Sequence, residues 1–171
     1  STLINGGVYR RPTLLKPKAG SIGVGQRVIT QETSDQMRSL MRLVVSRGTG
    51  RKANVRGYLI GGKTGTAEKT SRRGYSKSAK LSSFVGAFPM NDPRYVVLAL
   101  LDEPVGNKRT FNYATGGWVA APVVGKVIAR MAPMVGIAPA MNVEIDMPDI
   151  STGKAPPQPR KPVRKAKTRQ A

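Results

Sequence analysis

Apolar residues recur with a helical period between Thr30 and Arg47. They fall at i, i+3, i+4, i+7 and i+8, the spacing of one helix face, and are Met37, Leu40, Met41, Val44 and Val45. Thr30 or Thr33 can cap the first turn, and Gly48 provides a stop signal. We therefore predict a helix over Thr30–Arg47 whose apolar stripe faces the core.

Three further apolar segments predict a sheet: Tyr58–Glu68, Leu81–Phe88 and Tyr95–Leu101. Thr70–Lys80 predicts a basic, polar connection that is too long for a tight hairpin. The last segment is apolar almost throughout, which predicts a central strand with helices covering both faces. Strands joined locally favour an antiparallel meander, and we expect the first strand at one edge.

A second helix is predicted over Trp118–Met131, with Pro122 in its first turn, where a missing N–H costs little. From Ser151 onward the chain is mostly Pro, Lys, Arg, Gln and Ala, with seven Lys or Arg and no acid. Such a segment buries too little apolar area to offset its ordering entropy. We predict one domain over residues 1–138 and a basic, Pro-rich, disordered tail over residues 139–171.

Composition narrows the chemistry. The 171 residues include no Cys and no His, which excludes a Ser-His-Asp triad and the usual thiolate and imidazole metal ligands. No apolar run approaches the roughly 20 residues of a membrane-spanning helix, and a start at Ser1 favours a piece of a longer protein. The net charge of +20 first suggests nucleic acid, although the few aromatics are not interleaved with the basic residues as stacking platforms would be.

The segment Gly61–Lys69 carries the densest chemistry, and two motifs compete for it. Residues Gly57–Thr64 satisfy the phosphate-loop pattern GxxxxGK[ST]. That pattern needs a strand before the loop and a helix after it, but a turn-like basic stretch precedes Gly57 and Gly65 follows Thr64. This context disfavours the nucleotide interpretation.

The second motif is Lys63-Thr64-Gly65, the K-T-G of active-site serine penicillin-recognising enzymes. Together with its flanks, the chain resembles the C-terminal part of the transpeptidase domain of class B penicillin-binding proteins, the division-specific peptidoglycan D,D-transpeptidases above all. The resemblance implies an α/β fold: the C-terminal portion of the serine penicillin-recognising (β-lactamase/transpeptidase-like) fold, an antiparallel sheet packed with helices. The matching stretches are Met37–Val45, Gly48–Gly50, Gly61–Lys69, Ser82–Pro89 and Ala114–Pro122.

The resemblance also implies roles for four residues. Lys63, Thr64, Gly65 and Thr66 would bind substrate, with the Lys63 ammonium and the two threonine hydroxyls on the substrate carboxylate. Lys63 and Thr66 would be catalytic, Thr66 through a backbone N–H in the oxyanion hole. No cofactor and no metal are implied. A solvated, glycine-rich surface turn is the alternative for these residues.

The nucleophile is missing from the expected place. The family uses a Ser-x-x-Lys pair and a Ser-x-Asn, and the literal Ser-x-x-Lys match is Ser151–Lys154, after the K-T-G and in the predicted tail. We interpret that match as chance, because the family order is the reverse. Ser-x-Asn is absent. Both motifs are therefore expected upstream of Ser1, and this chain alone is expected to be inactive.

By resemblance, the parent protein cross-links septal peptidoglycan during cell division through a serine acyl-enzyme. It would act at the periplasmic face of the inner membrane, anchored by an N-terminal helix absent here. The implied partners are peptidoglycan stem peptides, β-lactams and other divisome proteins, with no nucleic acid expected. Two alternatives stay open: a carboxypeptidase or β-lactamase of the same fold, and a basic nucleic-acid-binding or scaffold module.

Overall fold

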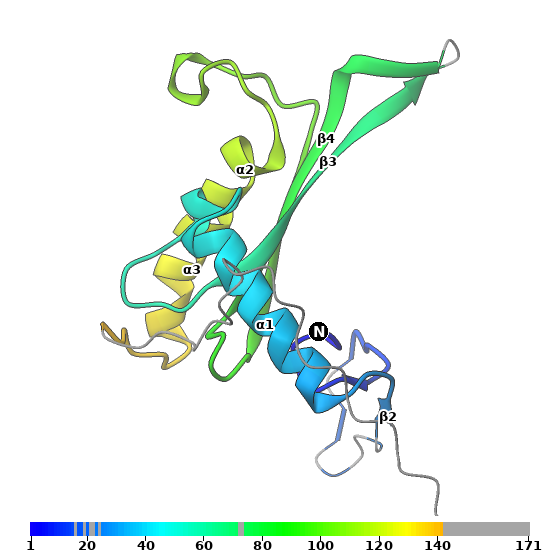
Figure 1. The fold of residues 1–171 in the computed structure, drawn as a ribbon, viewed down its shortest axis with the longest axis vertical. Helices are drawn as coiled ribbons and strands as arrows, with labels where there is room; N and C mark the ends of the chain where they lie inside the picture. The colour runs from blue at the N-terminus through cyan, green and yellow to red at the C-terminus, as the bar shows by residue number, and fades with distance from the viewer. Residues whose placement is uncertain (16, 19, 21–22, 24, 72–73, 142–171) are drawn as a thin grey trace, which may run out of the picture.

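Two antiparallel sheets and three α-helices make up the computed structural model, which describes residues 1–15, 17, 18, 20, 23, 25–71 and 74–141 (Figure 1). Strands β1 (Val8–Tyr9) and β2 (Gln26–Arg27) form a small sheet. The main sheet has the order β3–β4–β5, with β3 at Gly61–Ser71, β4 at Gly74–Phe88 and β5 at Tyr95–Asp102. The predicted antiparallel meander, with the motif strand at an edge of the described sheet, is confirmed.

Helix α1 spans Gln31–Ser46, as the apolar period predicted. Thr30 is its N-cap, and the Thr30 hydroxyl accepts a hydrogen bond from the Thr33 N–H at 3.1 Å. The predicted stripe is only partly the buried face: Leu40 is 43% exposed. The buried residues of α1 are Ser34, Ser39, Arg42 and Val45.

Arg42 is charged and yet lies on the inner face of α1, because its guanidinium finds hydrogen-bond partners there. Its guanidinium donates to the Asn54 side-chain oxygen at 3.0 Å and to the Ile60 carbonyl at 3.1 Å. A buried cation is tolerated when hydrogen bonds satisfy its donors. Arg42 therefore ties α1 to the loop after it and to the residue that precedes β3.

The long β3–β4 hairpin corrects the predicted connection over Thr70–Lys80. The strands pair from Gly61↔Ala87 to Ser71↔Gly74, with a register irregularity between Glu68 and Lys69. In Figure 1 they continue together, well beyond the helices, as a projecting arm. The prediction was wrong because residues 70–80 lack the alternation of apolar and polar residues that identifies a strand in a sequence.

Strand β5 is half exposed, which corrects the prediction that helices cover both of its faces. Alternate residues, Tyr95, Val97, Ala99 and Leu101, pack against the main core. The intervening Val96, Leu98 and Leu100 are 49%, 63% and 56% exposed. Within the described residues, β5 is an edge strand with one covered face.

The covered face of the sheet lies under the last two helices, α2 (Gly116–Val119) and α3 (Ala121–Met134). The predicted helix over Trp118–Met131 is therefore two helices that meet at Ala120. Phe84 of β4 and the α3 residues Val124 and Ile128 are fully buried at this contact. No helix in the described part of the chain is long and apolar enough to cross a membrane.

Register defines the two faces of the sheet. One cross-strand row is Thr64, Phe84 and Ala99, on the helix-covered face. The next row is Lys63, Val85 and Leu98, which we call the open face because all three are exposed. Nearer α1 that side is closed by a second small core of Ile4, Leu59, Ala87 and Met90.

Candidate functional site

Strand β3 divides the four predicted site residues between the two faces. Lys63 is exposed on the open face, and its ammonium donates to the Thr64 carbonyl at 2.9 Å. Thr64 and Thr66 point to the helix-covered face, because side chains alternate along a strand. Gly65 lies between the two threonines and pairs with Ser83 of β4.

Lys63, Gly65 and the two threonines lie on β3, the strand at one edge of the described main sheet. Backbone groups two residues apart on a strand point the same way, so the N–H groups of Thr64 and Thr66 share one side of β3. The Lys63 ammonium and the backbone of this edge strand therefore meet on one short stretch, where the ammonium reaches the Thr64 carbonyl.

The two threonine hydroxyls are fixed by segments that are distant in sequence. The Thr64 hydroxyl is hydrogen bonded to the Thr49 hydroxyl at 3.1 Å, and the Thr66 hydroxyl accepts from the Gly116 N–H at 3.1 Å. Gly116 lies so close to the sheet that a Cβ would stand 2.2 Å from the Ser83 carbonyl oxygen and 2.5 Å from that of Gly65. Glycine is therefore required where α2 begins.

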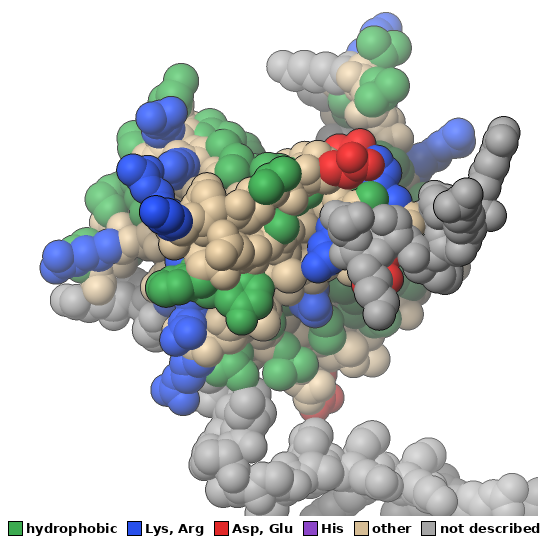
Figure 2. All heavy atoms as spheres, turned by 90° about the horizontal axis from the view of Figure 1, so that it is seen from above, with side chains coloured by type: hydrophobic (Ala, Val, Ile, Leu, Met, Phe, Trp, Pro, Cys, Tyr) green, Lys and Arg blue, Asp and Glu red, His purple; other side chains and the backbone are tan. Residues whose placement is uncertain are grey.

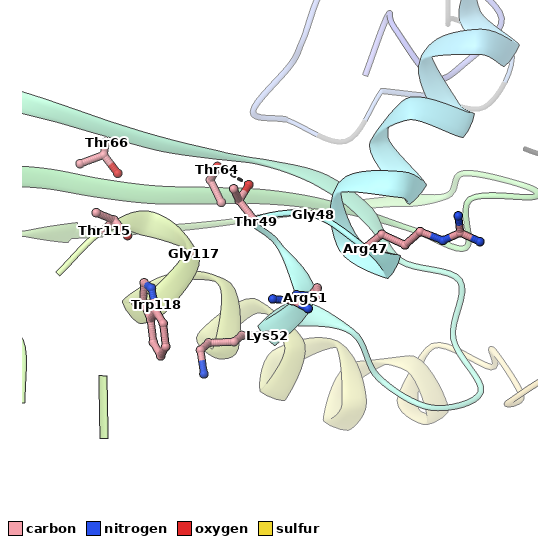
Figure 3. A pocket seen from close by; sticks show the side chains of 10 residues that line it. All are labelled: Arg47, Gly48, Thr49, Arg51, Lys52, Thr64, Thr66, Thr115, Gly117 and Trp118. Carbon is pink, nitrogen blue, oxygen red and sulfur yellow. Dashed lines mark hydrogen bonds between the residues drawn. The ribbon is translucent and has the colours of Figure 1, made fainter. Parts of the chain in front are cut away.

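A cavity of about 810 Å³ opens beside the two threonines on the helix-covered side (Figure 3). Of the four predicted site residues, Thr64 and Thr66 line it, whereas Lys63 and Gly65 do not. The other walls of the cavity were not predicted from the sequence, although Gly48–Gly50 and Gly116–Gly117 fall within the stretches that carried the resemblance. The remaining lining residues are Arg47, Gly48, Thr49, Arg51, Lys52, Thr115, Gly117 and Trp118.

Trp118 is the aromatic residue that lines this cavity. The Lys52 ammonium lies 4.2 Å from the centre of the Trp118 ring. Tyr113 stacks on Trp118 with centroids 5.5 Å apart, and Phe111 meets it edge-on at 5.5 Å. Figure 2 shows lysine and arginine side chains gathered along one side of the molecule.

This arrangement supports anion binding, because cationic side chains, threonine hydroxyls and backbone N–H groups lie close together on and beside β3.

The described serines give no sign of a nucleophile, because the hydroxyls with described hydrogen bonds donate to backbone carbonyls. They are those of Ser34, Ser39, Ser46 and Ser82. The Ser151–Lys154 pair lies outside the described residues. Lys69, further along β3, pairs with Asp102 at 2.7 Å and Glu103 at 2.9 Å.

Comparisons with known proteins agree with this geometry. The family model described as the penicillin binding protein transpeptidase domain matches residues 1–129. The chain is 45% identical over 146 residues to the probable peptidoglycan D,D-transpeptidase FtsI of Caulobacter vibrioides, covering 80% of this chain and 25% of that protein. It is 38% identical over 152 residues to stage V sporulation protein D of Bacillus subtilis, covering 83% of this chain and 23% of that protein.

Solved structures match in the same way. The transpeptidase domain of Burkholderia pseudomallei penicillin-binding protein 3 has a TM-score of 0.70 and 33% identity, covering 84% of this chain and 41% of that one. Penicillin-binding protein 3 of Mycobacterium tuberculosis, solved with ampicillin, has a TM-score of 0.66 and 28% identity, covering 81% and 34%. The chain spans about a quarter of the length of the two curated relatives. The predicted family and fold are confirmed: the chain belongs to the penicillin-binding protein transpeptidase family.

Proposed function

We propose that this chain is the substrate-anchoring part of a serine peptidoglycan D,D-transpeptidase that cross-links septal peptidoglycan. The observation that carries the proposal is the position of Lys63–Thr66 on the free edge of β3. The identity to a probable peptidoglycan D,D-transpeptidase supports it. The substrates are stem peptides ending in D-Ala-D-Ala, and β-lactams are their mimics.

Each residue has one task in this proposal. The Lys63 ammonium and the Thr64 and Thr66 hydroxyls bind the terminal carboxylate of the stem peptide, because charge-assisted hydrogen bonds are the strong ones. The Thr66 N–H is one donor of the oxyanion hole, and the N–H of the nucleophilic serine is the other. Gly65 keeps side-chain bulk away from the ligand.

The serine and its lysine base come from a segment outside residues 1–171. The serine oxygen attacks the penultimate D-Ala carbonyl while its proton passes to the lysine. The C–N bond to the terminal D-Ala then breaks, and the lysine returns that proton to the departing nitrogen, so the terminal D-Ala leaves as an amine. A neighbouring stem-peptide amine then resolves the acyl-enzyme. The open face supports a nucleophile-bearing segment from elsewhere in the protein. Lys63 lies there in one row with Val85 and Leu98, two exposed apolar side chains that such a segment would cover.

The cellular setting is part of the same proposal. The parent is anchored in the inner membrane, with this domain on the periplasmic face and other divisome proteins as partners. Residues 1–138 form the C-terminal part of the transpeptidase domain. The predicted disordered tail falls, from residue 142 onward, outside the described part of the chain.

Labelling with fluorescent penicillin tests the proposal. In the full-length protein, Lys63→Ala should slow acylation at least about tenfold, since a hydrogen bond to a charged group contributes roughly 1.5–3 kcal/mol. Lys126→Ala is the matched control, because Lys126 is an exposed lysine on α3. Acylation of the Lys63 variant at the wild-type rate would overturn the site.

The isolated chain supplies the second arm of that test. It should give no labelled band after denaturation, because no activated serine is present. A heat-stable band at the mass of this chain would place the nucleophile within residues 1–171, and Ser151 would be the first residue to mutate.

A further inference from the structure

The wall of the cavity opposite β3 is built from two cations and one aromatic ring that the proposed anchoring of one carboxylate does not use. Arg51 and Lys52 belong to a short turn, η1 (Arg51–Ala53), and Trp118 belongs to α2. Figure 3 shows the Lys52 side chain beside the Trp118 ring, whereas the guanidinium of Arg47 points away from the cavity. We call Arg51, Lys52 and Trp118 the far wall.

The far wall is electropositive without a matching acid. No Asp or Glu is among the residues that line the cavity. The ion pairs found in the described residues lie elsewhere, between Arg38 and Asp35 on α1 and between Lys69 and its two carboxylates beside the arm. An anion that enters the cavity therefore meets cations whose charge no lining carboxylate offsets.

The Lys52 ammonium is positioned by an aromatic ring and not by a carboxylate. A cation–π contact holds the ammonium over the ring face while some of its three N–H donors stay available. The ring itself is fixed by the stack with Tyr113 and the edge contact with Phe111. The charge is thus oriented in advance for a ligand.

The loop that carries these rings is braced in an unusual conformation. Phe111 and Asn112 have positive φ angles of 49° and 61°. The Asn107 side chain accepts from the Arg109 and Thr110 N–H groups at 2.9 and 3.2 Å, and the Asn107 carbonyl accepts from Asn112 at 2.9 Å. A residue other than glycine keeps a left-handed conformation only where its surroundings fix it. The hydrogen bonds of Asn107 therefore hold the Phe111 and Tyr113 rings in place against Trp118.

We infer that the far wall binds a second carboxylate of the peptide whose terminal carboxylate is held at Lys63–Thr66, namely an acidic side chain nearer the peptide's N-terminus. The inference rests on the proposed function. Thr64 and Thr66 belong both to the anchoring strand and to the cavity wall, so the two anion sites share one continuous surface. Thr49 and Thr115 also line this cavity.

A matched pair of peptides tests the inference on the complete 171-residue chain. The probes are N-acetyl-Glu-D-Ala-D-Ala and its glutamine analogue, together with the pair that has one alanine inserted after the acidic position. Trp118 is the sole tryptophan of the chain, so its fluorescence reports binding at the far wall, and calorimetry gives independent affinities.

In at least one pair, the glutamate peptide should bind about fivefold more tightly than the glutamine peptide, the upper end for a solvent-accessible ion pair. The ratio should fall to about one in Lys52→Gln and stay unchanged in Lys126→Gln, a control on α3. It should also fall toward one as salt is raised. Equal affinities within both pairs, or a ratio that survives Lys52→Gln, would overturn the inference.

A C-terminal amide separates this inference from the proposed function. Amidation removes the terminal carboxylate alone, so it should weaken binding in the wild type and leave the glutamate-to-glutamine ratio in place. If amidation has no effect, the anchoring at Lys63–Thr66 fails. If only the glutamate-to-glutamine ratio is absent, the far wall fails and the anchoring stands.

Discussion

The two faces of the main sheet carry similar apolar residues but meet opposite surroundings. Phe84 on the helix-covered face is fully buried under α3, whereas Leu98, one strand away on the open face, is 63% exposed. A row of large apolar side chains in water is costly to solubility and usually marks a contact surface. The difference indicates that no described residue covers the row of Lys63, Val85 and Leu98, whereas the opposite face is packed under helices. Under the proposed function, this uncovered row meets a further part of the protein.

Alanine substitutions on the two faces give the largest expected contrast. Phe84→Ala should lower the free energy of unfolding by about 3–5 kcal/mol, because it removes a ring and leaves a cavity. Leu98→Ala in the same chain should change it by no more than about 0.5 kcal/mol, as is usual at exposed sites. Urea denaturation curves of the two variants measure both values, and comparable losses would show that the open face is covered in solution.

Gly116→Ala examines the covered face where α2 touches the sheet. Its Cβ would overlap the Ser83 and Gly65 carbonyl oxygens, so α2 must move and the bond from Gly116 to Thr66 must lengthen. We expect a loss of about 1–3 kcal/mol in unfolding free energy, typical of overpacking. Gly23→Ala is the control, since nothing lies within 4 Å of its added Cβ. Equal effects in the two variants would contradict the close contact.

The contrast between the faces also explains what could be predicted from sequence. Thr30–Arg47 was predictable because capping and period act within one segment. The cover over β5 was not, because Val97 and Leu98 are equally apolar and only tertiary contacts decide which of them is buried. The inner face of α1 was predicted only in part, for a similar reason: Val45 is buried as expected, but Arg42 is buried through partners at Asn54 and Ile60, which no helical period reveals.

For the site, the sequence yielded Lys63 to Thr66 through a contiguous motif, and the structure adds the neighbours that the motif omits. Thr49 and Gly116 reach the Thr64 and Thr66 hydroxyls from segments 15 and 50 residues away along the chain. The far wall unites η1 and α2 in the same way. Contacts of this separation depend on how the helices pack onto the sheet, so local patterns carry no signal for them.

The smallest effect is expected at Lys69, where the arm leaves the body of the sheet. Hydrogen bonds to Asp102 first and Glu103 second raise the pKa of Lys69 above its ordinary value. A raised folded-state pKa means that the stabilisation is fully present below the unfolded value of about 10.4 and is lost as pH rises through the folded value. Lys69→Met should therefore lower Tm slightly at neutral pH, and the difference from wild type should disappear at strongly alkaline pH.

Thermal unfolding followed by circular dichroism from about pH 7 to pH 11 measures this difference, and Lys126→Met serves as a control for loss of a lysine charge. A Tm difference that grows above the ordinary lysine pKa would reverse the assigned sign. The result also tests a contact across the sheet, because Lys69 of β3 pairs with Asp102, the last residue of β5.

Arg42 has a consequence for the site that its burial alone does not express. Arg42 donates to the carbonyl of Ile60, the residue directly before β3, and so helps to hold the strand where it begins. A slip of one residue would invert every side chain of the strand, so that the Lys63 ammonium would point beneath α2 and the Thr64 hydroxyl would point to the open face. A guanidinium on a neighbouring helix thereby adds to the β3–β4 pairing in fixing which side of the strand presents the Lys63 ammonium.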